Sequence, residues 1–195
     1  MKNTLINNKL LIIIILLGLI SFSVKSQSFS SFEIENLSNL MTKDYSRPQI
    51  NIYANSFKSN PKVGFYYFAL INQYWAQAYG GVIIKPYNWM SVSIGAGLEV
   101  DENPYRLNVS LIIEKTRFNF IQIYEYGGSG FWYNVQANYK INQQNYLGVV
   151  GKRYYGVGIN YEHNLKQFPL TFTVSPLYDF EDETYKLMIA VKYYL

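Results

Sequence analysis

The sequence has 195 residues, no cysteine and a single histidine, His163. Without cysteine the chain has no disulfide, no Cys-His catalytic pair and no thiolate zinc cluster. A phosphate-binding loop is also missing, because the glycines at 127, 128 and 130 fall in a turn between two expected strands rather than at the start of a helix. We predict no catalytic residue, no metal site and no cofactor. His163 is expected to be an interfacial side chain at a strand end, and the protein is not expected to be an enzyme.

Charged residues are few, at 15% of the chain, and the net charge of +4 comes from its first part. Without Lys2, Lys9 and Lys25, 14 basic residues remain against 13 acidic ones. The longest basic run beyond them is Lys152-Arg153. This near-neutral chain without a basic cluster argues against nucleic-acid binding.

The first 26 residues have the order of a secretory signal peptide. Lys2 and Lys9 precede an apolar run from Leu10 to Ile20, and a short polar stretch follows. The run is about half of the roughly 20 residues that a membrane-spanning helix needs. Val24 and Ser26 have the small-residue spacing that favours cleavage after Ser26. We therefore predict residues 1–26 as a signal peptide and the mature protein as exported.

From residue 62 onward, apolar and polar residues alternate with a period of two, as in Val92, Ile94 and Ala96 against Ser91 and Ser93. Short turn-forming clusters separate the alternating segments, so neighbouring strands must be antiparallel. We predict an all-β, antiparallel up-and-down barrel over residues 62–195 with about ten strands, eight being the alternative. The expected strands cover residues 63–71, 74–85, 89–101, 105–115, 117–127, 131–141, 146–152, 154–163, 168–178 and 184–195.

The composition of the two faces indicates a transmembrane barrel. The polar face consists mainly of Ser, Thr, Asn, Gln and Gly, whereas a soluble sandwich would expose many charges there. Tyrosines also flank aliphatic centres, as Tyr185 and Tyr193 flank Leu187, Ile189 and Val191, which is typical of aromatic girdles at the membrane interfaces. The alternative is a soluble, lipocalin-like exported protein whose apolar face turns inward around a ligand.

The last strand, which alternates through Val191 and Tyr193 to Leu195, resembles the strand by which outer-membrane barrels are recognised for insertion, although such strands usually end on Phe or Trp. As a whole, residues 62–195 resemble the small outer-membrane β-barrels of Gram-negative bacteria, the OmpX-like class. The resemblance implies an outer-membrane location. It also implies contact with membrane lipid and with the outer-membrane insertion machinery through the C-terminal strand.

Residues 27–61 lack sustained alternation and are rich in Ser and Asn. Ser30 with Glu33 has the spacing of a capping box, and Ile34 and Leu37 fit one face of a short helix that Arg47-Pro48 would end. Ile50, Ile52 and Ala54 suggest a brief strand after it. We predict a helical or irregular segment, either a periplasmic arm or plug or a partly ordered leader.

Two groups of charges are expected inside the barrel. Glu99 and Arg106 are equidistant from the turn at 101–104 and should face each other as a lumen ion pair. Lys140, Glu162 and Lys192 should form a charge cluster near the periplasmic end of the lumen. Such groups either close the lumen or line a narrow pore, and closure is favoured because Trp75, Tyr79 and Trp132 are expected to add bulk. The favoured function is therefore a structural or surface-interaction role, with a small-solute porin and the lipocalin-like binder as alternatives.

Overall fold

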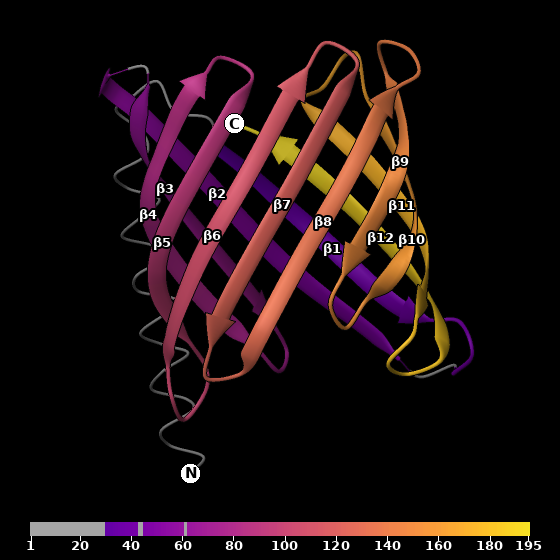
Figure 1. Cartoon of the computed structure of the whole chain (residues 1–195). Helices are drawn as coiled ribbons and strands as arrows, with labels where there is room; N and C mark the ends of the chain where they lie inside the picture. The colour runs from indigo at the N-terminus through magenta and orange to yellow at the C-terminus, as the bar shows by residue number, and fades with distance from the viewer. Residues whose placement is uncertain (1–29, 43–44, 61) are drawn as a thin grey trace.

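The alternating segments form twelve antiparallel strands in the computed structural model, which describes residues 30–42, 45–60 and 62–195 (Figure 1). The strands are β1 (Ser30–Asn39), β2 (Ser46–Asn60), β3 (Val63–Asn72), β4 (Ala76–Tyr87), β5 (Met90–Glu99), β6 (Tyr105–Lys115), β7 (Phe118–Gly127), β8 (Gly130–Lys140), β9 (Asn145–Lys152), β10 (Gly156–Asn164), β11 (Leu170–Asp179) and β12 (Thr184–Tyr194). The described residues contain no helix long and apolar enough to cross a membrane.

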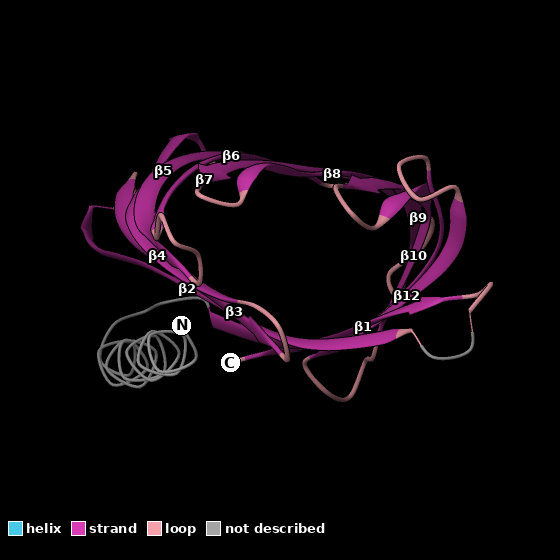
Figure 2. Cartoon of the chain, turned by 90° about the horizontal axis from the view of Figure 1, so that it is seen from below, coloured by secondary structure: helices cyan, strands magenta, loops and turns pink. Residues whose placement is uncertain are grey.

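Each strand pairs with its neighbours along the chain, and pairing of β1 with β12 closes the barrel, with Ile34 opposite Val191 (Figure 2). Since the number of strands is even, β1 begins and β12 ends at the same end of the barrel. We call this the terminal end. The opposite end, which carries the β1–β2, β3–β4, β5–β6, β7–β8, β9–β10 and β11–β12 connections, is the loop end.

The expected strand number, ten or eight, is wrong. The ten strands expected from residue 62 onward correspond to β3 to β12, but residues 30–60, expected to be helical or irregular apart from a brief strand at Ile50, Ile52 and Ala54, form β1 and β2. The brief strand is confirmed as part of β2. Among the described residues the barrel begins at Ser30, and no helix follows the Ser30–Glu33 spacing. Pairing on both sides decides the conformation, because Ile34 stands opposite Val191 of β12 and Ile50 of β2. The predicted signal peptide lies outside the described residues.

The assignment of the two faces is confirmed. Ile94 on β5 is 66% exposed on the outer surface, whereas its neighbour Ser93 is 4% exposed and faces the lumen. Leu107 is likewise exposed and Asn108 buried on β6. The apolar face therefore turns outward, as a lipid-facing surface requires, and the inward-turned apolar face of a lipocalin-like binder is not observed.

Exposed aromatic side chains lie near both ends of the outer surface. Tyr105 and Tyr126 are exposed at the loop end, and Trp89 and Tyr139 are exposed at the terminal end. Between these levels the outer surface is mainly aliphatic, with Ile94 as an example. This is the arrangement of two interfacial girdles around a hydrocarbon-facing band.

Among the described residues, buried apolar side chains form three clusters, and two of these lie on opposite sides of the barrel. One joins β1, β9, β11 and β12 through Leu37, Val150, Tyr155, Leu177 and Met188. The other lies on β3 and β4 and consists of Tyr66, Tyr79 and Ile83, with Tyr53, Phe57 and Phe68 packed against it. The cross-section is oval, and the two groups of strands belong to its two opposite sides (Figure 2). These clusters account for interior apolar residues that strict alternation does not predict.

Candidate functional site

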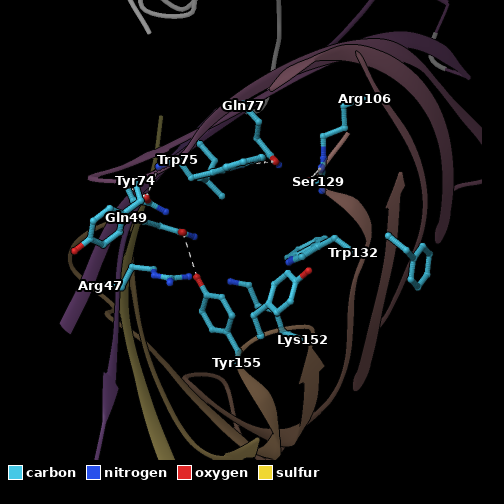
Figure 3. A pocket seen from close by; sticks show the side chains of 14 residues that line it. Arg47, Gln49, Tyr74, Trp75, Gln77, Arg106, Ser129, Trp132, Lys152 and Tyr155 are labelled. Carbon is cyan, nitrogen blue, oxygen red and sulfur yellow. Dashed lines mark hydrogen bonds between the residues drawn. The ribbon is translucent and has the colours of Figure 1, made fainter. Parts of the chain in front are cut away.

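A cavity of about 240 Å³ opens inside the loop end of the barrel (Figure 3). Gln77, Arg106 and Ser129 lie on one side of it, and Arg47 and Tyr155 lie on the facing side (Figure 3). Its wall comes from β2, β3, β4, β6, β8 and β9 and from the connections after β3, β7 and β9. The curvature of the sheet around the lumen therefore assembles the site from strands far apart in the sequence.

The cavity wall combines positive charge with aromatic surface. Arg47, Arg106 and Lys152 line it together with the indoles of Trp75 and Trp132. The lining residues include no Asp or Glu. The carboxylates at this level lie behind the cations, and the three cations differ in how fully these carboxylates compensate them.

Arg106 is fully compensated by two buried carboxylates. It forms ion pairs with Glu99 and with Glu125, whose Oε2 lies 2.7 Å from the Arg106 Nε. The Tyr79 hydroxyl donates to Glu125 at 2.7 Å, and the Ser129 backbone N–H donates to Glu99 at 2.8 Å. Arg106, Glu99 and Glu125 are each at most 3% exposed. This network joins β4, β5, β6 and β7 at the loop end.

The two residues expected to form a lumen ion pair are thus in contact, but their register differs from the expected one. Arg106 stands opposite Gly97, and the Glu99 N–H bonds to the carbonyl of Pro104, so the two side chains meet diagonally. Gly127, opposite Arg106 on β7, leaves the space that Glu99 needs, since a Cβ there would lie 2.5 Å from a Glu99 carboxylate oxygen. Sequence reasoning missed Glu125, which comes from the next hairpin.

Lys152 is compensated by one carboxylate. Its Nζ lies 2.8 and 2.9 Å from the two carboxylate oxygens of Glu35 and 3.8 Å from the centre of the Tyr155 ring. The Gln49 amide donates to Glu35 at 2.9 Å and accepts from the Tyr155 hydroxyl at 3.1 Å. This network connects β1 and β2 with β9. It could not be anticipated, because Glu35 and Gln49 fall in the segment expected to lie outside the barrel wall.

Arg47 has no acidic partner among the residues that the structure describes. None of the described ion pairs includes it, and its buried Nε has no hydrogen-bond partner. Its guanidinium carbon lies 5.5 Å from the centre of the Tyr45 ring. Arg47 therefore brings a positive charge with an unused Nε–H donor to the cavity.

The three residues expected to form a charge cluster lie in the terminal half of the barrel, but each has its own partners. Lys192 pairs with Glu33 at 2.9 Å. Glu162 accepts hydrogen bonds from three amides, those of Gln136, Asn138 and Asn160, at 2.6 to 3.0 Å. Lys140 lies 5.8 Å from the ring centre of Tyr146. A joint role for these residues in the lumen stays a prediction.

His163 and the acidic residues offer no alternative site. The His163 Nδ1 lies 2.8 Å from the Asn145 side-chain oxygen at the terminal end. Across residues 30–42, 45–60 and 62–195, no group of three or more His, Asp or Glu side chains is placed to hold a metal ion.

The fold matches that of solved porins. The KdgM porin in complex with disordered oligogalacturonate superposes with a TM-score of 0.60 at 13% sequence identity, over 84% of this chain and 98% of that one. A second structure of the KdgM porin gives 0.56 at 13% identity over the same shares. The NanC porin gives 0.52 at 12% identity, over 85% of this chain and 100% of that one. No protein-family model and no curated protein sequence matches the chain.

These likenesses show the fold: the chain is a closed β-barrel of the kind seen in solved porins. More particularly, it has the closed, twelve-stranded antiparallel architecture and shares its fold with the KdgM and NanC porins over nearly their full length.

Proposed function

We propose that the protein is a pore for small solutes and that its loop-end cavity favours an acidic saccharide. The observation that carries the proposal is the cavity wall, where Arg47, Arg106 and Lys152 stand beside Trp75 and Trp132 without any carboxylate. We place the loop end at the cell surface and the terminal end in the periplasm, in keeping with the resemblance of β12 to an insertion strand. Solutes would then meet this cavity on entry.

The chemistry of the wall suits a carboxylated sugar. An arginine donates paired, charge-assisted hydrogen bonds to a carboxylate, and the Nε–H of Arg47 is a donor that no described protein group uses. The indole faces of Trp75 and Trp132 offer apolar surface for the C–H face of a sugar ring. Because Arg106 and Lys152 are already compensated, they contribute shape and hydrogen bonding more than net charge. The resulting attraction is modest, and a pore needs this so that the solute can leave.

The comparisons support the pore over a structural role. The three neighbours described above are porins, and one of them was solved with oligogalacturonate, which is an acidic saccharide. The sequence favoured a barrel filled by Trp75, Tyr79 and Trp132. In the structure Tyr79 belongs to an apolar cluster at one side, and both tryptophans line a cavity rather than filling it.

The proposal is tested by recording currents through the purified protein in planar bilayers. We expect discrete conductance steps, and we expect trigalacturonate added on the loop-end side to interrupt the current at lower concentration than neutral maltotriose. In Arg47→Gln the half-blocking concentration of trigalacturonate should rise about three- to tenfold, as for the loss of one partly solvated charged hydrogen bond. Maltotriose should be unaffected.

Lys166→Gln, which removes an exposed cation at the terminal end, is the matched control and should leave the block unchanged. A protein that is folded by its heat-dependent gel mobility yet gives no conductance would contradict the pore and favour the structural role. A pore that is blocked equally by both sugars would contradict the acidic preference alone.

A further inference from the structure

The charged side chains are distributed unequally between the two ends of the barrel. The terminal half carries more bases than acids among the residues whose side chains the structure describes. Its basic residues are Lys62, Lys85, Lys115, Arg117, Lys140, Lys166 and Lys192, and its acidic residues are Glu33, Glu114 and Glu162. Seven bases against three acids give this half a side-chain charge of +4.

The loop half has the opposite balance. Its basic residues are Arg47, Arg106, Lys152, Arg153 and Lys186, and its acidic residues are Glu35, Glu99, Asp101, Glu102, Glu125, Asp179, Glu181, Asp182 and Glu183. Five bases against nine acids give a side-chain charge of −4. The charges of these side chains therefore sum to zero but are strongly polar along the barrel axis.

The charges that cause this polarity are mostly at the rims. In the loop half, the buried carboxylates Glu35, Glu99 and Glu125 are held in ion pairs. Glu102 and Glu183 are exposed in the loop-end connections. At the terminal end, Lys115, Arg117 and Lys166 are exposed. Solution ions that approach either mouth meet these rim charges first.

Distance keeps the two rims electrically separate. The hydrocarbon-facing band of such a barrel is about 25 Å tall. The Debye length is about 10 Å at 0.1 M salt and about 3 Å at 1 M. At 0.1 M each mouth therefore attracts its own counterions, cations at the loop end and anions at the terminal end, whereas at 1 M both fields are screened.

We propose that the pore rectifies, passing more current when the compartment at the loop end is positive. The inference rests on the proposed pore function. With that polarity cations enter through the acidic mouth and anions through the basic mouth, so both accumulate in the lumen and the conductance rises. With the opposite polarity each ion must enter through the mouth of its own sign, and the lumen is depleted of carriers.

The test is the current–voltage curve of single pores at 0.1 M and 1 M KCl. We expect a current ratio between the two polarities on the order of twofold at 0.1 M that falls close to one at 1 M. The orientation of the pore in the bilayer is determined with the variant Tyr74→Cys, whose cysteine is unique in the chain. Tyr74 is an exposed cavity residue at the loop end. A charged, membrane-impermeant thiol reagent then changes the current only from the loop-end compartment.

Two triple variants separate the contributions of the rims. Glu102→Gln, Glu181→Gln and Glu183→Gln together bring the loop half from −4 to −1, and Lys115→Gln, Arg117→Gln and Lys166→Gln bring the terminal half from +4 to +1. Both variants should reduce rectification. The reversal potential in a KCl gradient should shift toward anion selectivity in the first variant and toward cation selectivity in the second. Gln143→Ser with Gln167→Ser, which changes the terminal connections without changing charge, should behave as the unmodified protein.

A symmetric current–voltage curve at 0.1 M, or a larger current with the loop-end compartment negative, would overturn the inference while leaving the pore intact. Rectification that persists unchanged in both triple variants would also overturn it. The absence of conductance would instead overturn the proposed pore itself.

Discussion

The cations of the loop-end cavity differ in their compensation, and the difference separates stability from solute binding. Arg106 has two buried carboxylates and Lys152 has one, whereas Arg47 has none among the described residues. A buried cation with matched partners cannot be removed without leaving a buried charge. An uncompensated cation at a cavity has no such role and is available to an anionic solute. We therefore expect that removing Arg106 lowers stability most and removing Arg47 lowers it least. The effect on permeation, relative to that on stability, should be largest for Arg47.

The two compensated cations also differ in the contacts that they make along the chain. Arg106 and Glu99 are seven residues apart and belong to one hairpin. Lys152 and Glu35 are 117 residues apart, so this contact requires β1 to be joined to the rest of the barrel. The Arg106 network can form within a four-strand unit, whereas the Lys152 network depends on closure.

The largest expected effect is that of Arg106→Gln. It leaves Glu99 and Glu125 buried without their cation, and we expect the free energy of unfolding to fall by about 3–5 kcal/mol. Urea unfolding in lipid vesicles measures the change. Arg117→Gln, which removes an exposed arginine, is the control and should change the free energy by less than about 0.5 kcal/mol.

A mutant cycle sharpens this expectation. Because Arg106 serves two carboxylates, adding Glu99→Gln to Arg106→Gln should recover only part of the loss, and adding Glu125→Gln as well should recover more. Strictly additive losses would show that the three side chains do not act as one network. They would also count against the diagonal contact across β5 and β6.

The effect of Lys152→Met should be smaller, at about 2–3 kcal/mol. Only Glu35 loses its cation, and it keeps the hydrogen bond from Gln49. The methionine preserves the apolar contact with the Tyr155 ring. Combining it with Glu35→Gln should restore much of the stability, measured by the same unfolding experiment. A single mutant as stable as the control Lys166→Met would mean that closure of the barrel does not depend on this pair.

The contrast between the networks also explains what the sequence could predict. The strands β3 to β12 and the lipid-facing side of β5 and β6 were predictable, because outward apolar residues such as Ile94 alternate with small polar ones such as Ser93. The Glu99–Arg106 contact was predictable because one turn joins the two strands. Its register was not, since the diagonal contact depends on the space at Gly127 and on Glu125 from another hairpin.

The segment containing β1 was not predictable from alternation, because it has apolar residues on both faces. Ile34 is exposed on the outer surface, whereas Leu37 is fully buried in an interior cluster. Their spacing of three suits a helix as well as a strand whose two faces are both partly apolar. Because this segment was expected to lie outside the barrel wall, Glu35 and Gln49 were not among the residues expected in the lumen. The Lys152 network and the part of the cavity wall on β2 were therefore not predicted.

A still smaller effect is expected at the terminal end, for Lys192→Met. The Lys192 side chain is 36% exposed and that of its partner Glu33 is 17% exposed, so water screens the pair. We expect a loss of about 0.2–1 kcal/mol that diminishes between 0.1 M and 1 M salt, measured by urea unfolding at both concentrations. A loss above 2 kcal/mol that does not respond to salt would indicate a dry terminal half of the lumen, contrary to an open pore.

The smallest effect on stability belongs to Arg47→Gln, which should leave the free energy of unfolding within about 0.5 kcal/mol of the unmodified value. Removing this cation strands no described carboxylate and relieves a buried Nε that has no hydrogen-bond partner. Its effect should appear instead in permeation, as a shift of the reversal potential away from anions in a KCl gradient at 0.1 M. Lys152→Met, by contrast, removes the partner of Glu35 and should change the free energy of unfolding more than the ion selectivity. If Arg47→Gln destabilised the barrel by more than 2 kcal/mol with no change in reversal potential, Arg47 would be a structural cation like Arg106, and the division between stabilising and solute-facing charge would fail.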